Sequence, residues 1–109
     1  MKIEEHIKMV KLFDVYGKLL SQRQFEVFDK YLNLDIGESE LAKMSGESRQ
    51  SIYDAINKAK KQLITFEEKC GIVKNNEMMA LSLNQIREKL QVNDIESSLE
   101  MINKLINNE

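Results

Sequence analysis

The chain has 109 residues, a length in the range of one ordinary domain, and 42% of them are hydrophobic, which is enough to bury a core. Proline and tryptophan are absent and glycine occurs 4 times, a composition that favours helices and argues against a β-sandwich with its many turns. The formal net charge of -2 excludes a domain held to nucleic acid by bulk positive charge alone. We therefore predict an all-α fold.

Two helices are predicted in the first third of the chain. Apolar residues recur at helical spacing between Lys2 and Tyr16, which predicts a first helix over that range. Ser21 and Gln24 then form the S-x-x-Q signature of a capping box, so a second helix is expected to begin at Ser21. The apolar side of this second helix is formed by Phe25, Phe28 and Leu32.

The segment 40–56 has the spacing of a helix-turn-helix, the motif that reads the major groove of DNA. A short helix is expected to end near Gly46, a residue suited to a left-handed helix end. Ser48 is a good N-cap for the second helix of the motif. The turn departs from the usual pattern because Ser45 and Glu47 replace apolar residues beside Gly46, and we expect Met44 to fill the gap.

A long helix and a helical hairpin are predicted after the turn. From Ile52 onward, apolar residues are spaced four, three, four and three apart until Gly71. Two further stripes repeat at four, three, four, and Asn93 with Glu96 forms an N-x-x-E cap between them. The stripes consist of Met79, Leu83, Ile86 and Leu90, and of Ile95, Leu99, Ile102 and Ile106.

We therefore divide the chain into a helix-turn-helix domain over 1–71 and a C-terminal helical hairpin over 72–109. Isolated helices of this length are marginal in water and must bury their apolar stripes. The hairpin can do so by packing on the long helix of its own chain or on a second copy of the chain. Of these alternatives we favour a homodimer.

The candidate nucleic-acid-binding residues lie on the polar side of the predicted reading helix. Arginine and glutamine near the start of such a helix suit guanine and adenine edges, and the first backbone amides suit a phosphate. From Ser48 to Gln62 the chain has four basic residues against one acidic residue, and Arg23 and Lys43 are candidates for the same face. The predicted interface consists of Ser48, Arg49, Gln50, Tyr53, Asp54, Asn57, Lys58, Lys60 and Lys61.

Several other classes of protein are not expected. The acidic Glu4 and Glu5 are followed by no long apolar run, so we expect a cytoplasmic protein without a signal peptide or membrane span. Cys70 is the only cysteine and His6 the only histidine, which leaves no ligand set for a metal and no pair of nucleophile and base. We predict no catalytic residue, no metal and no cofactor.

Particular motifs resemble known bacterial families. The segment from Leu20 to Leu63 resembles region 4 of the sigma-70 family, with Leu20-Ser21-x-x-Gln24, Glu40-Leu41-Ala42 and Ser48-Arg49 at the matching helix starts. The pieces LFDVYGKLLSQRQ, SRQSIYDAI and FEEKCG, followed by an acidic helical hairpin, resemble the YlxM family of small bacterial proteins. This second resemblance covers nearly the whole chain.

The resemblance to the YlxM family implies an all-helical, dimeric helix-turn-helix protein. Its gene usually lies beside those of the signal recognition particle GTPase and its receptor, and its members are described as regulators or accessory proteins of that pathway. Two functions follow as alternatives. The first is a non-enzymatic regulator that binds DNA, and the second is an accessory factor that binds the particle's GTPase or its RNA.

Overall fold

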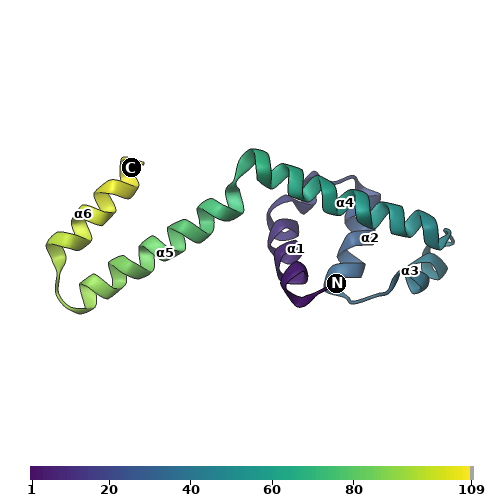
Figure 1. Ribbon diagram of the computed structural model, residues 1–109, viewed down its shortest axis with the longest axis horizontal. Coiled ribbons are helices and arrows are strands. Elements are labelled where there is room, and N and C mark those ends of the chain that lie inside the picture. The colour runs from purple at the N-terminus through teal and green to yellow at the C-terminus, as the bar shows by residue number, and fades with distance from the viewer. Residues whose placement is uncertain (109) are drawn as a thin grey trace. The chain divides into compact units, whose positions relative to one another are not determined.

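The computed structural model describes residues 1–108, and within that range it is built from helices and turns without a β-strand (Figure 1). This confirms the predicted all-α fold. The helices are α1 (Ile3–Tyr16), the short 3-10 helix η1 (Gly17–Leu19), α2 (Gln22–Asn33), α3 (Glu38–Ser45), α4 (Arg49–Cys70), α5 (Ile72–Gln91) and α6 (Ile95–Ile106). Across residues 1–108, no helix combines the length and the apolar character that crossing a bilayer requires.

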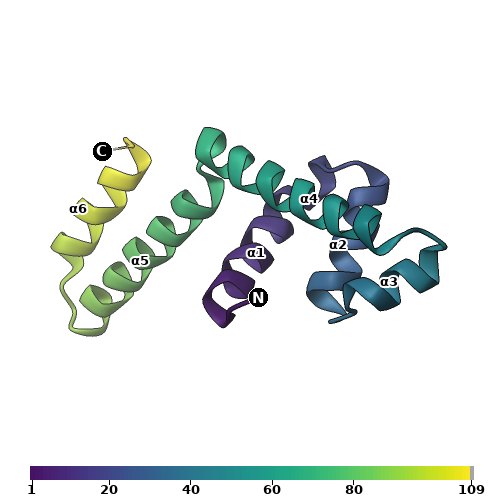
Figure 2. The ribbon, with the colours of Figure 1, turned by 45° about the vertical axis from the view of Figure 1, so that its right-hand side comes forward.

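The chain forms two compact units. The N-terminal unit comprises Met1–Val73 and holds α1 to α4 together with the first two residues of α5. The C-terminal unit begins at Lys74 and holds the rest of α5 and α6, which a tight turn joins into an antiparallel hairpin (Figures 1 and 2).

In the N-terminal unit, α1, α2 and α3 all pack against α4 (Figure 2). The predicted stripe of α4 lies at the centre of this core, where Ile52 and Leu63 are completely buried. Phe13 connects α1 to α2, with its ring centroid 4.9 Å from Phe25 and 5.6 Å from Phe28. The buried side of α4 is therefore fixed by the packing of three other helices.

Most helix ends follow the predicted capping signals. Ser21 and Gln24 form the capping box, in which the Gln24 N–H donates to the Ser21 hydroxyl at 3.2 Å and the Ser21 N–H donates to the Gln24 side chain at 3.3 Å. Gly46 and Gly71 end α3 and α4 in the left-handed region, with φ of 71° and 63°. Ser48 caps α4 by accepting a hydrogen bond from the Ser51 N–H at 3.0 Å.

The predicted cap of the last helix is wrong by one residue. Asp94, not Asn93, is the N-cap of α6, and its carboxylate accepts a 3.1 Å hydrogen bond from the Ser97 N–H. Asn93 instead adopts φ of 60° in the turn after α5, a conformation that asparagine tolerates better than most residues. The hydrogen bond from the Ser97 N–H holds the pKa of the Asp94 carboxyl below its usual range.

Candidate nucleic-acid interface

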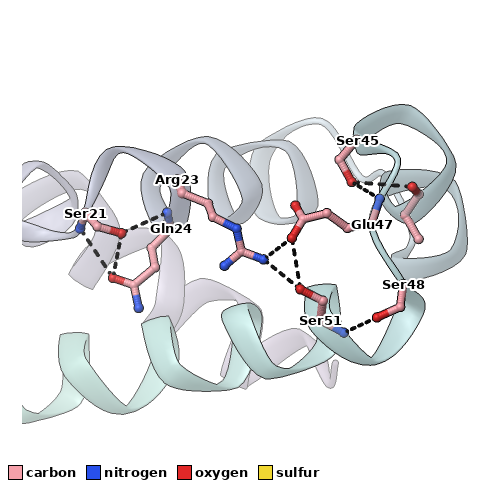
Figure 3. Close-up of polar contacts among 8 residues, drawn as sticks. Ser21, Arg23, Gln24, Ser45, Glu47, Ser48 and Ser51 are labelled. Atoms are coloured by element: carbon pink, nitrogen blue, oxygen red, sulfur yellow. Dashed lines mark hydrogen bonds and ion pairs between the residues drawn. The ribbon is translucent and has the colours of Figure 1, made fainter.

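Polar side chains hold the turn between α3 and α4 (Figure 3). The Ser45 hydroxyl donates to the Ala42 carbonyl at 3.4 Å and accepts the Glu47 N–H at 3.3 Å. The Glu47 carboxylate accepts hydrogen bonds from Arg23 and, at 2.9 Å, from the Ser51 hydroxyl. Arg23 also donates to the Ser51 hydroxyl at 2.9 Å, so α2, the turn and α4 are joined by one network.

This network explains why the turn does not need the usual apolar residues. The side chain of Met44 is 56% exposed, so the expectation that it fills the gap is wrong. The hydrogen bonds from Arg23 and then Ser51 hold the pKa of the Glu47 carboxyl below its usual range. Glu47 is therefore ionised at neutral pH and can keep both partners in place.

The predicted polar side of α4 lies outside the core. Ile52, Ala55 and Ile56 are buried against the rest of the unit, as expected. Most of the candidate residues are exposed, with Asn57 and Lys60 partly buried; the exposed ones are Ser48, Arg49, Gln50, Tyr53, Asp54, Lys58 and Lys61.

Four of the candidates form the outermost line of α4. Gln50, Asp54, Asn57 and Lys61 follow one another at intervals of four, three and four residues, opposite the buried side of the helix. Within this outer line the Gln50 side-chain amide donates a 2.8 Å hydrogen bond to the Asp54 carboxylate, which fixes the orientation of the amide. The outer line thus presents amide, carboxylate and ammonium groups over about three turns of helix.

Two cationic candidates point away from the outer line. The Lys60 ammonium lies 3.4 Å from the Glu5 carboxylate on α1 and 5.8 Å from the centroid of the Tyr31 ring. Its side chain is 20% exposed. Arg49 lies near α3, with its guanidinium 3.9 Å from the Glu38 carboxylate, but its side chain is 72% exposed. Arg49 is therefore available to a ligand, whereas Lys60 faces α1.

An open groove of about 690 Å³ runs between the start of α2 and α4. It brings Ser21 and Arg23 beside Ser48, Gln50 and Lys58. The sequence identified Ser21 only as a helix cap, because its place in the groove depends on how α2 packs on α4. Gln62 also lines the groove, and its side-chain oxygen is a buried atom without a hydrogen-bond partner within residues 1–108.

Comparisons with known proteins identify the family. The family model described as "Putative helix-turn-helix protein, YlxM / p13 like" (UPF0122) matches residues 3–105. A UPF0122 protein of Clostridium novyi is 34% identical over 96 residues, which cover 88% of this chain and 82% of that protein. A UPF0122 protein of Thermoanaerobacter sp. is 33% identical over 89 residues, covering 82% of this chain and 76% of that protein. These matches confirm the family indicated by the sequence motifs: the chain belongs to the UPF0122 family of YlxM / p13 like helix-turn-helix proteins.

Proposed function

We propose that this protein is a regulatory DNA-binding protein that places α4 in the major groove. The observation that carries the proposal is the outer line of α4, in which Gln50, Asp54 and Lys61 are exposed, on a helix whose opposite side is fixed in the core. The major groove is about 12 Å wide and admits one α-helix. The first residues of α4 are the ones that would reach the base edges in this arrangement.

The side chains at the start of α4 match the chemistry of base edges. Arginine makes two hydrogen bonds to guanine, and glutamine or asparagine makes two to adenine. Arg49, Gln50 and Asn57 are therefore assigned to base contacts. Asp54 can accept a hydrogen bond from the amino group of cytosine, once Gln50 exchanges its hydrogen bond for one to a base.

The groove between α2 and α4 is assigned to the phosphate backbone. Lys58 is an exposed cation of α4 that lines this groove, and Ser21 with Arg23 lies across it at the start of α2. Lys61 is a second exposed cation, on the outer line of α4, and is also assigned to a phosphate. Few cations are involved, and Arg23 is already paired with Glu47. Each subunit is expected to neutralise about three phosphates, so that binding to random DNA is weak and falls steeply with salt.

The DNA-bound form is proposed to be a homodimer. Two reading helices about 34 Å apart would enter successive major grooves on one side of the duplex. Such a dimer would recognise two half-sites related by a two-fold axis, as is usual for bacterial helix-turn-helix regulators. No reaction is assigned to the protein, because the groups assembled in the groove are those of a binding surface.

The proposal is tested by titrating labelled random duplex DNA with the protein at several salt concentrations, followed by fluorescence anisotropy. Arg49→Ala should weaken binding about tenfold, the loss expected for one good base or phosphate contact. Lys8→Ala is the matched control, because it removes one positive charge from an exposed position on α1. Absence of binding by the wild-type protein at low salt would overturn the proposal.

A second candidate function is favoured by the acidic groups of the same surface. Asp54 lies within the outer line and Glu47 engages Arg23, while the whole chain carries a net charge of -2. Negative charge favours a protein partner with basic groups over a nucleic acid, so the candidate partner is the GTPase of the signal recognition particle. The RNA of the particle would instead be bound through the exposed Lys58 and Lys61. Replacing the DNA by each of these components in the same titration distinguishes the two functions.

A further inference from the structure

Two arginines of the proposed DNA-binding surface, Arg23 and Arg49, each lie beside a glutamate. The guanidinium of Arg49 is 3.9 Å from the Glu38 carboxylate, a distance too long for a hydrogen bond. Arg23, by contrast, donates a hydrogen bond to the Glu47 carboxylate. The Arg23 pair is therefore the one in which a glutamate restrains its arginine.

The hydroxyl of Ser51 closes this pair into a triangle of hydrogen bonds (Figure 3). The Arg23 Nη2 atom donates to the Glu47 carboxylate and, at 2.9 Å, to the Ser51 hydroxyl. The Ser51 hydroxyl donates to the same carboxylate oxygen at 2.9 Å, and the backbone N–H of Glu47 donates to Ser45. Glu47 is thus anchored by α4 and by its own turn, and it holds the end of the Arg23 side chain at that turn.

The pairing affects the charge of the groove between α2 and α4. The charged side chains that line this groove are the cations Arg23 and Lys58 and the carboxylate of Asp54, which together leave one positive charge. The ionised Glu47, hydrogen-bonded to Arg23, cancels that charge. Since a phosphate is attracted by net positive charge, the groove as it stands attracts one weakly.

Both members of the pair reach solvent. The side chain of Arg23 is 48% exposed and that of Glu47 is 32% exposed. Ion pairs at such exposure contribute little to stability, so the N-terminal unit should remain folded without this one. An Arg23 side chain released from Glu47 is free to turn toward a phosphate in the groove that it already lines.

We infer that the Arg23–Glu47 pair is an inhibitory ion pair, in which Glu47 withholds Arg23 from the phosphate backbone and so weakens the binding of nucleic acid. Phosphate contacts carry no sequence information. The inhibitory ion pair therefore lowers the affinity for DNA of every sequence and leaves the base contacts of α4 a larger share of the binding. The inference rests on the proposed function, because the phosphate backbone is the ligand assigned to this groove.

The first test is the affinity of Glu47→Gln for a random duplex, measured by fluorescence anisotropy at several salt concentrations. This variant removes the charge of Glu47 but keeps a side-chain oxygen that can accept the hydrogen bond from Ser51. One additional phosphate contact should steepen the logarithmic salt dependence by about 0.9 and tighten binding about eightfold at roughly 0.1 M salt. Glu40→Gln is the matched control, because it removes one negative charge from an exposed position of α3 and should have a smaller effect.

The same two substitutions in an Arg23→Gln background show whether the gain comes from Arg23. Without the arginine, Glu47→Gln and Glu40→Gln should change the affinity equally. Glu47→Ala, which removes the acceptor as well, should tighten binding of the Arg23 protein as Glu47→Gln does, and circular dichroism verifies that each variant is folded. A Glu47→Gln protein that binds no more tightly than Glu40→Gln, or a gain that persists without Arg23, would overturn the inference.

Elution from a heparin column separates failure of this inference from failure of the proposed function, because heparin presents dense negative charge and no bases. Glu47→Gln should elute at a higher salt concentration than Glu40→Gln, and the difference should vanish in the Arg23→Gln background. This elution order, combined with a wild-type protein that does not bind DNA, would overturn the proposed function but support the inhibitory ion pair. Equal elution of Glu47→Gln and Glu40→Gln would overturn the inhibitory ion pair whatever the result with DNA.

Discussion

The hydroxyl of Tyr16, at the end of α1, donates a 2.6 Å hydrogen bond to the carboxylate of Glu67 in the last turns of α4. Both groups also serve the start of α5. The Ile72 N–H donates to the Tyr16 hydroxyl at 3.1 Å, and the Val73 N–H donates to the Glu67 carboxylate at 3.0 Å. Amides in the first turn of a helix have no partner within the helix. Tyr16 and Glu67 therefore act together as a tertiary cap where α4 ends and α5 begins.

Removing the Tyr16 hydroxyl should destabilise the N-terminal unit. Tyr16 is 1% exposed. Tyr16→Phe removes the hydrogen bond that the Glu67 carboxylate accepts from the hydroxyl and the hydrogen bond that the Ile72 N–H donates to it. We expect the melting temperature, followed by circular dichroism, to fall by roughly 4–8 °C. Tyr53→Phe is the matched control because the Tyr53 side chain is exposed on α4. Equal melting temperatures for the two variants would show that the tertiary cap contributes nothing.

The network at the helix-turn-helix should make stability depend on acid pH. The hydrogen bonds from Arg23 and Ser51 lower the pKa of Glu47 from its ordinary value of 4.5. A carboxyl group with a lowered pKa contributes stability above the pKa of the unfolded chain, and this contribution is lost as the pH falls through the folded pKa. Near neutral pH, Glu47→Gln should therefore lower the midpoint of urea unfolding by about 0.5 M.

The difference between wild type and Glu47→Gln should shrink as the pH falls below 4.5 and through the lowered pKa of the folded protein, because the wild-type carboxyl then becomes neutral as well. This difference in the midpoint of unfolding is measured by urea titrations of both proteins at several pH values. Glu40→Gln, at an exposed position of α3, is the control that should leave the midpoint at neutral pH unchanged. A constant difference at every pH would contradict the role given to the ionised Glu47.

The two glycines at the ends of α3 should respond differently to substitution. Gly46 has φ of 71°, a conformation that is strained for alanine although no atom lies within 4 Å of the added Cβ. Gly46→Ala should therefore lower the free energy of unfolding by about 1 kcal/mol. Gly37 has φ of -70° and precedes α3, so Gly37→Ser should be neutral or slightly stabilising as a new N-cap. The free energy of unfolding of both variants is measured by chemical denaturation. An unchanged free energy of unfolding in Gly46→Ala would contradict the claim that alanine is strained at this position.

Local signals predicted most of the fold, whereas contacts between distant residues were not visible in the sequence. Ser21, Gln24 and Ser48 act through backbone amides three residues or fewer away, so their spacing was sufficient to identify them. Asp94 was missed because Asn93 is also a good cap, and the choice depends on which residue takes the left-handed conformation in the turn. Both residue types suit an N-cap.

The arrangement of the candidate residues on and around α4 was predicted less completely for the same physical reason. Arg23 and Glu47 are 24 residues apart, and their pairing requires α2 to lie beside the turn. Lys60 shares a helix with Lys61, but only the packing of α1 shows that Lys60 faces Glu5. The periodicity of α4 identified its polar side, while tertiary contacts decide which of these polar residues remain available.

The most direct test of the proposed interface compares two adjacent lysines of α4 on duplex DNA. Lys61 belongs to the exposed outer line, whereas Lys60 is paired with Glu5. The affinity for a random duplex, measured by fluorescence anisotropy at several salt concentrations, should decrease in Lys61→Ala, and its logarithmic salt dependence should become shallower by about one unit. Lys60→Ala should retain the wild-type salt dependence. Equal effects of the two substitutions, or no binding by the wild-type protein, would contradict the placement of the outer line of α4 in the major groove.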